Sequence, residues 1–162
     1  WAITGRPATR KPNVMTTLEL DSYQMERHNE RFQKTYRLIE ENEVRYQEYY
    51  TDDAEYLIVA FGSIARICLK SIEELRSQGV KIGLIRPITL WPFPVAPFKK
   101  AADKVKQVIS VELSMGQMIE DVRLATECKV PVTLCNRVGG MIPSPEQVLE
   151  AIKAAAKNGG AK

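Results

Sequence analysis

The sequence predicts a three-layer α/β domain in which helices cover both faces of a mostly parallel, five-stranded sheet, preceded by an N-terminal linker helix. From residue 52 onward, four apolar runs rich in β-branched residues alternate with helical stretches, and such repeats favour parallel strand pairing. The runs occupy residues 57–61, 81–85, 107–111 and 130–134. They are nearly continuous in apolar residues, which is typical of strands that are covered on both faces.

Residues 1–51 are predicted to form an interdomain linker. Residues 1–17 show no apolar periodicity, so we expect them to be extended. A charged helix with a narrow apolar stripe is expected from Asp21, which has N-cap spacing to Gln24, through residue 41. Residues 44–50 favour a short edge strand, and continuation of the helix is the alternative. Because the first residue is a tryptophan, we expect the chain to be part of a longer polypeptide.

Residues 52–162 are predicted to form the α/β domain itself. Its helices are expected at 64–77, with Ser63 as N-cap, and at 96–104 and 116–127. A last helix is expected from Pro145, with Ser144 as N-cap, and its pattern ends at 158–160.

Composition excludes several classes of protein. Apolar residues at 44% and charged residues at 27% are ordinary for a globular domain, and no apolar run approaches the roughly 18–20 residues that span a bilayer. The three cysteines form no C-x-x-C pair, which indicates reduced thiols and a cytoplasmic location. A lysine cluster at 99–106 is typical of a solvated helix face, and no interleaved aromatic residues support nucleic-acid binding.

The unusual residues follow the predicted strands, at the edge of the sheet where open α/β domains meet ligands and partners. Gly62 and Ser63 follow the first run, and Gly116 and Gln117 follow the third. These four residues are candidates for a phosphate cradle at helix N-termini, for coenzyme A or a nucleotide, with Lys99 or Lys100 nearby. The alternative is a tight strand-to-helix turn. No G-x-G-x-x-G spacing is present, and Arg86 stands where an NAD site places an acidic residue.

Four residues are predicted to serve structure or an interface. Glu112 ends an apolar strand and needs a hydrogen-bond donor or a cation, for which the helix starting near residue 116 or another domain is a candidate. Trp91 and Phe93 belong to the unusually apolar connection 90–94, typical either of a contact surface or of packing over the domain's own core, and Arg86 ends the strand before it. We predict no catalytic residue and no metal site in this chain, since its only histidine is His28 in the linker helix.

Three segments resemble a known family. Residues 53–63, DAEYLIVAFGS, resemble the opening of the transketolase C-terminal-like domain. Residues 83–94, GLIRPITLWPFP, and 111–118, VELSMGQM, closely resemble the α subunits of 2-oxoacid:ferredoxin oxidoreductases. The N-terminal part is similar to the linker that follows the pyrimidine-binding domain in those subunits, so the resemblance covers essentially the whole chain.

The resemblance implies a whole enzyme that decarboxylates a 2-oxo acid oxidatively to an acyl-CoA. Such an enzyme uses thiamine diphosphate, Mg²⁺, an iron–sulfur cluster and coenzyme A, none of them expected to be held by this chain. The implied partners are the N-terminal domain of the same subunit, the β and γ/δ subunits, and ferredoxin. The implied sheet has an antiparallel edge strand, for which 44–49 is suited. The 83–94 motif is most similar to the 2-oxoisovalerate type, then to the 2-oxoglutarate type, then to the pyruvate type.

The sequence thus leaves three hypotheses about function. The first is a domain for subunit assembly, the second a phosphate-ligand-binding module, and the third a stand-alone interaction protein.

Overall fold

A computed structural model describes residues 5–14 and 16–158 of the chain, although side chains from residue 155 onward are not described. The chain separates into two compact units, Trp1–Leu38 and Ile39–Lys162. None of the helices within the described residues is long and apolar enough to cross a membrane.

The second unit contains one five-stranded sheet with the spatial order β1-β3-β2-β4-β5. Its strands are β1 (Tyr46–Tyr49), β2 (Tyr56–Val59), β3 (Ile82–Pro87), β4 (Gln107–Glu112) and β5 (Val132–Asn136). Strand β1 pairs antiparallel with β3, and the other neighbours are parallel. The mixed sheet and the edge strand at residues 44–50 are therefore confirmed.

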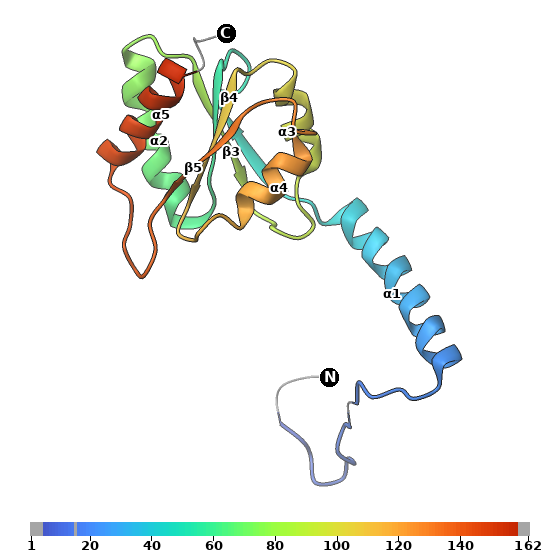
Figure 1. Ribbon diagram of the computed structural model, residues 1–162. Coiled ribbons are helices and arrows are strands. Elements are labelled where there is room, and N and C mark those ends of the chain that lie inside the picture. Colours follow the sequence, from blue (N-terminus) through green and yellow to red (C-terminus); the bar gives the residue numbers. More distant parts are fainter. Residues whose placement is uncertain (1–4, 15, 159–162) are drawn as a thin grey trace. The chain divides into compact units, whose positions relative to one another are not determined.

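Two helices cover each face of the sheet, which confirms the three layers (Figure 1). The helices are α2 (Gly62–Ser77) and α5 (Pro145–Asn158) on one face, and α3 (Val95–Ala102) and α4 (Met118–Ala125) on the other. Successive residues of β2 point to opposite faces, so that Leu57 and Val59 pack with Phe98 while Ile58 packs with α2. This two-sided burial explains why β2, β3 and β4 are continuous in apolar residues. The expectation of two covered faces is wrong for β5, because it is an edge strand in which Thr133 and Leu134 are exposed.

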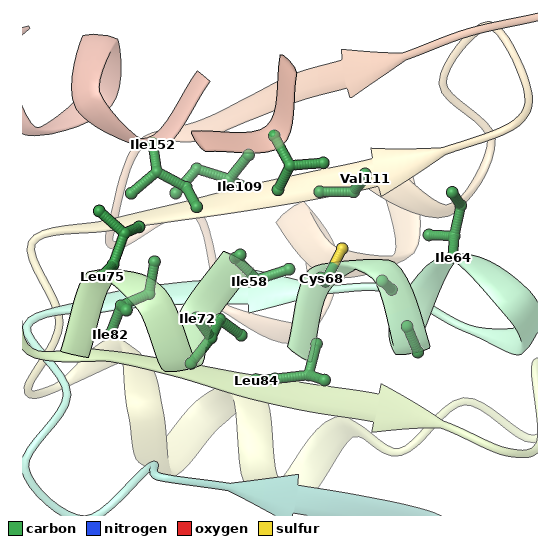
Figure 2. Close-up of a cluster of buried hydrophobic side chains, with 13 residues drawn as sticks. Ile58, Ile64, Cys68, Ile72, Leu75, Ile82, Leu84, Ile109, Val111 and Ile152 are labelled. Atoms are coloured by element: carbon green, nitrogen blue, oxygen red, sulfur yellow. The ribbon is translucent and has the colours of Figure 1, made fainter. Parts of the chain in front are cut away.

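The larger core lies between the sheet and α2 and α5. Ile58, Cys68 and Ile72 are fully buried there, together with Ile109 of β4 and Ile152 of α5 (Figure 2). Each such aliphatic side chain contributes about 1.5–3 kcal/mol when it leaves water. The core therefore fixes the sheet against its helices, and the strand ends are held in place as a consequence.

The helix α1 (Ser22–Asn42) matches the predicted charged helix. The Asp21 carboxylate accepts hydrogen bonds from the amides of Tyr23 and Gln24 at 2.9 and 3.2 Å, which confirms the predicted cap. No residue of α1 is buried, and Phe32 and Tyr36 stack on each other with ring centroids 6.5 Å apart.

The other helix starts were predicted with mixed success. Ser144 and Gln147 form a reciprocal capping box at the start of α5, with distances of 3.3 and 3.1 Å, as expected. The prediction of Ser63 as a cap is wrong, because α2 begins at Gly62, two residues before the predicted start at 64, and its N-cap is the extended residue Phe61, without a side-chain cap. Residues 159 and 160, where the last helix was expected to fade, lie outside the described residues.

The edge strand β1 is held close to β3 by a glycine. A Cβ atom at Gly83 would lie 2.7 Å from the carbonyl oxygen of Tyr50 and 3.1 Å from that of Tyr49. The hydrogen-bonded sheet thus includes a segment before residue 52, and the compact unit begins at Ile39.

Candidate functional site at the carboxyl edge of the sheet

The four parallel strands end at one edge of the sheet, and an exposed apolar side chain follows each of them. We call this set the apolar edge. It consists of Phe61 after β2, Ile88, Leu90 and Trp91 after β3, Leu113 and Met115 after β4, and Val138 after β5. Of these residues, the sequence indicated a contact surface only for the connection that contains Leu90 and Trp91, because a single apolar residue after a strand is indistinguishable from the strand's own end.

Glu112, the last residue of β4, is the best-connected polar side chain at this edge. It is 2% exposed, and its carboxylate accepts five hydrogen bonds. Two come from the hydroxyls of Ser110 and Ser114, both at 2.7 Å. Three come from backbone amides of residues 117–119, at 2.8–3.0 Å.

The three amides belong to the first turn of α4, so Glu112 caps this helix from outside it. Gln117, at the N-cap position, makes no side-chain cap of its own. An anionic group at a helix N-terminus satisfies amides that have no partner within the helix and interacts favourably with the helix dipole. Burial raises the pKa of Glu112, but hydrogen bonds from Ser114, Ser110 and the amides of Met118 and Ile119 outweigh it and lower the pKa below 4.5. The expected partnership with this helix is confirmed.

A small cavity of about 210 Å³ opens beside Glu112. Its lining combines the apolar edge with polar groups of α4: Phe61, Leu90, Glu112, Leu113, Ser114, Gln117, Met118 and Asp121. The cavity is smaller than the roughly 300–1,000 Å³ of typical small-molecule sites. Asp121 is an exposed residue, but its carboxyl group is partly shielded from water. This partial burial, together with the charges of Glu112 and Glu120, raises its pKa above 3.8.

The two aromatic side chains in the connection from β3 to α3 lie in different environments. Phe93 is partly buried and stacks on Phe98 of the core at 5.2 Å between ring centroids. Trp91 is 55% exposed and lines a concavity of about 560 Å³ together with Val44, Phe93 and Val95. Packing over the domain's own core is thus observed for Phe93, whereas Trp91 is exposed, and its role as a contact residue stays a prediction.

Arg86 lies on β3 opposite Gln47 of β1, and its Nη1 donates a 3.0 Å hydrogen bond to the Gln47 side chain. Its Nε is buried without a hydrogen-bond partner among the described residues. The guanidinium is thereby attached to the edge strand and lies on the same carboxyl edge.

The phosphate-cradle candidates are only partly brought together. Gly62 and Ser63 are exposed at the start of α2, and Gly62 has a φ of +60°, which favours glycine. Gln117 lines the cavity beside Glu112, whereas Gly116 packs near Ile119 and Leu134.

The two lysines proposed to assist a phosphate lie elsewhere. Lys99 pairs with Glu127, which follows the C-terminus of α4. Because the helices run antiparallel to the strands, this position is at the opposite edge of the sheet. Lys100 lines a separate small cavity with Glu48 and Asp52. The expectation that either lysine lies near the cradle is wrong.

The described residues do not fit a metal ion or an iron–sulfur cluster. No group of three histidine, cysteine, aspartate or glutamate side chains within them converges on one point. Cys68 is buried in the core, Cys128 is exposed, and Cys135 is partly buried in β5. His28 lies on α1, in the other unit of the chain.

Comparison with known proteins supplies the family. Residues 54–148 match the model of pyruvate:ferredoxin oxidoreductase core domain II. The ketoisovalerate oxidoreductase subunit VorB of Methanothermobacter thermautotrophicus is 45% identical over 156 residues, covering 96% of this chain and 44% of that subunit. The 2-oxoglutarate synthase subunit KorA of Methanothermobacter marburgensis is 32% identical over 106 residues, covering 65% of this chain and 28% of that subunit. The chain thus spans less than half the length of these curated relatives.

Solved structures support the fold. A 2-oxoglutarate:ferredoxin oxidoreductase from Magnetococcus marinus superimposes with a TM-score of 0.70 at 23% identity, over 85% of this chain and 24% of that one. A split-gene transketolase gives a TM-score of 0.60 at 17% identity, over 70% of this chain and 41% of that one. The predicted transketolase-like architecture is confirmed, and the matched family model spans more than half of the chain. This chain belongs to the family of pyruvate:ferredoxin oxidoreductase core domain II, found in subunits of 2-oxoacid oxidoreductases.

Proposed function

We propose that this chain is a domain for assembly within a subunit of a thiamine-diphosphate-dependent 2-oxoacid:ferredoxin oxidoreductase. Residues 52–162 would form its transketolase C-terminal-like part, and residues 1–51 the linker to the preceding domain. The observation that carries the proposal is the apolar edge, where exposed apolar side chains follow all four parallel strands. Apolar surface gathered on one face of a domain is typical of a contact with another protein surface.

Some residues at this edge hold the loops in place, and others are exposed and available to a partner. Glu112 fixes the start of α4 through three amides, and Phe93 anchors the β3–α3 connection in the core. The neighbouring Leu113 and Trp91 are exposed on these fixed supports. The interface role would therefore belong to Trp91, Leu113 and Arg86, while Glu112 and Phe93 hold the surface in shape.

The partners proposed for this surface are those implied by the family: the N-terminal domain of the same subunit and the β and γ/δ subunits. In the whole enzyme, ferredoxin would accept the electrons. Thiamine diphosphate, Mg²⁺, the iron–sulfur cluster and coenzyme A would be bound outside this chain.

The assembly role is tested by placing a charge on the apolar edge of the complete enzyme. Leu113→Asp should reduce recovery of the assembled complex at least about tenfold, because an aspartate loses its hydration when the interface closes. Leu124→Asp is the matched control, since Leu124 is an exposed leucine near the other end of α4. Size-exclusion chromatography with light scattering measures assembly. Equal recovery of both variants would contradict the proposal.

We further propose 2-oxoisovalerate as the substrate of the whole enzyme. Two ketoisovalerate oxidoreductase subunits match nearly the whole chain, at 45% and 41% identity. Three 2-oxoglutarate synthase subunits match about two-thirds of it, at 31–34% identity. Ferredoxin reduction by the purified complex with 2-oxoisovalerate, 2-oxoglutarate and pyruvate decides between them, and a higher kcat/KM for either of the last two would contradict the proposal.

A phosphate-ligand-binding module is the second candidate function. The observation in its favour is the exposed first turn of α2, which has no side-chain cap and begins at Gly62. A thermal-shift screen of this chain with coenzyme A and nucleotides tests it. A concentration-dependent rise in Tm with one of them would favour the module, and a flat result across the panel would exclude it.

A further inference from the structure

The cavity beside Glu112, which we call the edge pocket, has apolar walls and negative charge. Phe61, Leu90 and Leu113 are exposed side chains of the apolar edge that line it, and Met118 lies buried behind them. The polar lining includes two carboxyl groups, Glu112 and Asp121. A surface of this kind combines apolar contact area with attraction for a cation.

The charge of Glu112 is satisfied by hydrogen bonds without being neutralised. All five of its donors are hydroxyls or backbone amides, none of which carries a positive charge. No basic side chain within the described residues forms an ion pair with it. The negative potential of Glu112 therefore extends into the edge pocket.

Asp121 is the carboxylate that remains available to a partner. Its neighbour Glu120 is paired with Arg123, whereas Asp121 forms no ion pair with any described residue. The charges of Glu112 and Glu120 oppose its ionisation, and an incoming cation would relieve that repulsion. Glu112 has no such capacity, because its two oxygens already accept five hydrogen bonds.

The chemistry of the edge pocket favours arginine over lysine. A guanidinium is planar and weakly hydrated, stacks on aromatic and apolar faces, and binds a carboxylate with two parallel hydrogen bonds. Phe61 and Leu113 offer such faces beside the Asp121 carboxylate. A lysine ammonium is strongly hydrated and would lose more on entering an apolar cavity.

The length of the curated relatives indicates where the arginine comes from. The two ketoisovalerate oxidoreductase subunits extend well beyond this chain, which spans 44% and 43% of them. A segment of the same polypeptide reaches the edge pocket at a high effective concentration, which suits a contact as small as one side chain. We propose that the edge pocket receives an arginine side chain from the part of the same subunit that lies outside this chain, with Asp121 as its acceptor. This inference rests on the assembly role and names the chemistry of the docked segment.

Two small probes test the chemistry on this chain itself. ¹⁵N-labelled chain is titrated with N-acetyl-arginine methylamide and with N-acetyl-citrulline methylamide, which has nearly the same shape but no charge. We expect saturable shifts of the Leu113, Gln117 and Met118 amides with the arginine probe. The citrulline probe should bind about fivefold more weakly, the worth of one exposed ion pair. Equal shifts with the two probes, or none with either, would overturn the proposal.

Matched variants assign the acceptor. Asp121→Asn should make the arginine probe bind as weakly as the citrulline probe, whereas Glu120→Gln should leave the difference intact. Each amide spectrum also reports whether the variant keeps its fold. If Glu120→Gln removes the difference and Asp121→Asn does not, the assignment to Asp121 is wrong. If the arginine probe does not bind but Leu113→Asp still prevents assembly, this inference is wrong and the assembly role is retained.

Hydrogen exchange distinguishes the source of the arginine. In the complete subunit purified without its partners, the amides of residues 117–121 should exchange more slowly than in this chain alone, and Asp121→Asn should reduce that protection. Protection that requires the other subunits would contradict the same-subunit source. Protection that appears in this chain at high concentration would indicate a second copy instead, and would also contradict it.

Discussion

At the level of single residues, Glu112 shows how a buried charge is held without a counter-ion. Removing an ionised carboxylate from water is costly unless its oxygens are hydrogen-bonded. Here, five donors from β4, the following loop and α4 converge on one side chain. The same contacts cap α4 and fix the loop that carries Leu113. One residue thus links the stability of the domain to the shape of the candidate interface.

We expect Glu112→Gln to lower the free energy of unfolding by about 2–3 kcal/mol. The glutamine amide keeps only one acceptor oxygen, and its NH2 group would face donors that the second carboxylate oxygen now accepts. Urea unfolding at pH 7 measures the loss, and Glu73→Gln, at an exposed position of α2, is the control. A loss no larger than that of the control would contradict the capping role of Glu112.

The hydrogen bonds to Glu112 should also make the free energy of unfolding depend on pH. The folded pKa of Glu112 is lowered, so its contribution is fully present above the unfolded value of about 4.5 and is lost as pH falls through the folded value. The difference in unfolding free energy between the wild type and Glu112→Gln should therefore shrink as pH falls below 4.5. A difference that stays constant from pH 7 to pH 3 would contradict this prediction.

The three cysteines should react at very different rates. Burial, with a smaller effect of Cys135, raises the pKa of Cys68 to about 12, whereas Cys128 is exposed. Thiolates are the reactive species, and a rise from 9 to about 12 lowers the thiolate fraction about a thousandfold at neutral pH. Titration with a thiol-specific reagent should modify Cys128 first and Cys68 only after unfolding. Early labelling of Cys68, identified by peptide mass spectrometry, would contradict the packing described for α2.

At the level of elements, the helices of the domain begin in different ways. The helix α5 is capped locally by Ser144 and Gln147, three residues apart in the sequence. The helix α4 is capped by Glu112, which lies five to seven residues before the amides it binds. A local cap can be read from a sequence residue by residue because its spacing is fixed. For Glu112 the sequence indicated the helix as a candidate partner, but not which amides it would bind.

Ser144→Ala should lower the unfolding free energy by about 1 kcal/mol, because the amide of Gln147 loses its acceptor. Ser144→Asp should restore most of that loss, since aspartate is an equally good N-cap. Thermal unfolding by circular dichroism measures both variants. If alanine and aspartate destabilise to the same extent, the capping hydrogen bond is not the cause.

At the level of the whole molecule, β1 determines where the folded domain begins. The strand lies before residue 52 but completes the sheet through antiparallel pairing with β3. The close approach of the Tyr49 and Tyr50 carbonyls to Gly83 shows that the two strands are packed without room for a side chain. The compact unit accordingly starts at Ile39.

Two truncated chains test whether the folded domain begins at Ile39 or at Asp52. A chain that starts at Ile39 should unfold cooperatively with nearly the wild-type Tm, because it keeps the complete sheet. A chain that starts at Asp52 should lose at least about 5 °C, since β3 loses its edge partner and its apolar surface becomes exposed. Equal melting temperatures for the two truncations would show that β1 contributes nothing to the stability of the sheet.

Much of this protein follows from its sequence alone. Continuous apolar runs such as 107–111 identify strands covered on both faces, the Ser144 cap and Pro145 identify the start of α5, and the motifs at 83–94 and 111–118 identify the family. These features depend on residues that are close in the sequence, where spacing and periodicity are fixed by the geometry of helices and strands.

Only the tertiary structure decided the strand order, the five donors around Glu112 and the position of Asp121 on the edge pocket. In the sequence, Asp121 looks like any acidic residue on a helix surface. Its surroundings include Phe61 and Leu90, which are 60 and 31 positions away in the sequence. Such neighbours are set by how strands pair and helices pack across the sheet, and local patterns carry no record of those long-range contacts.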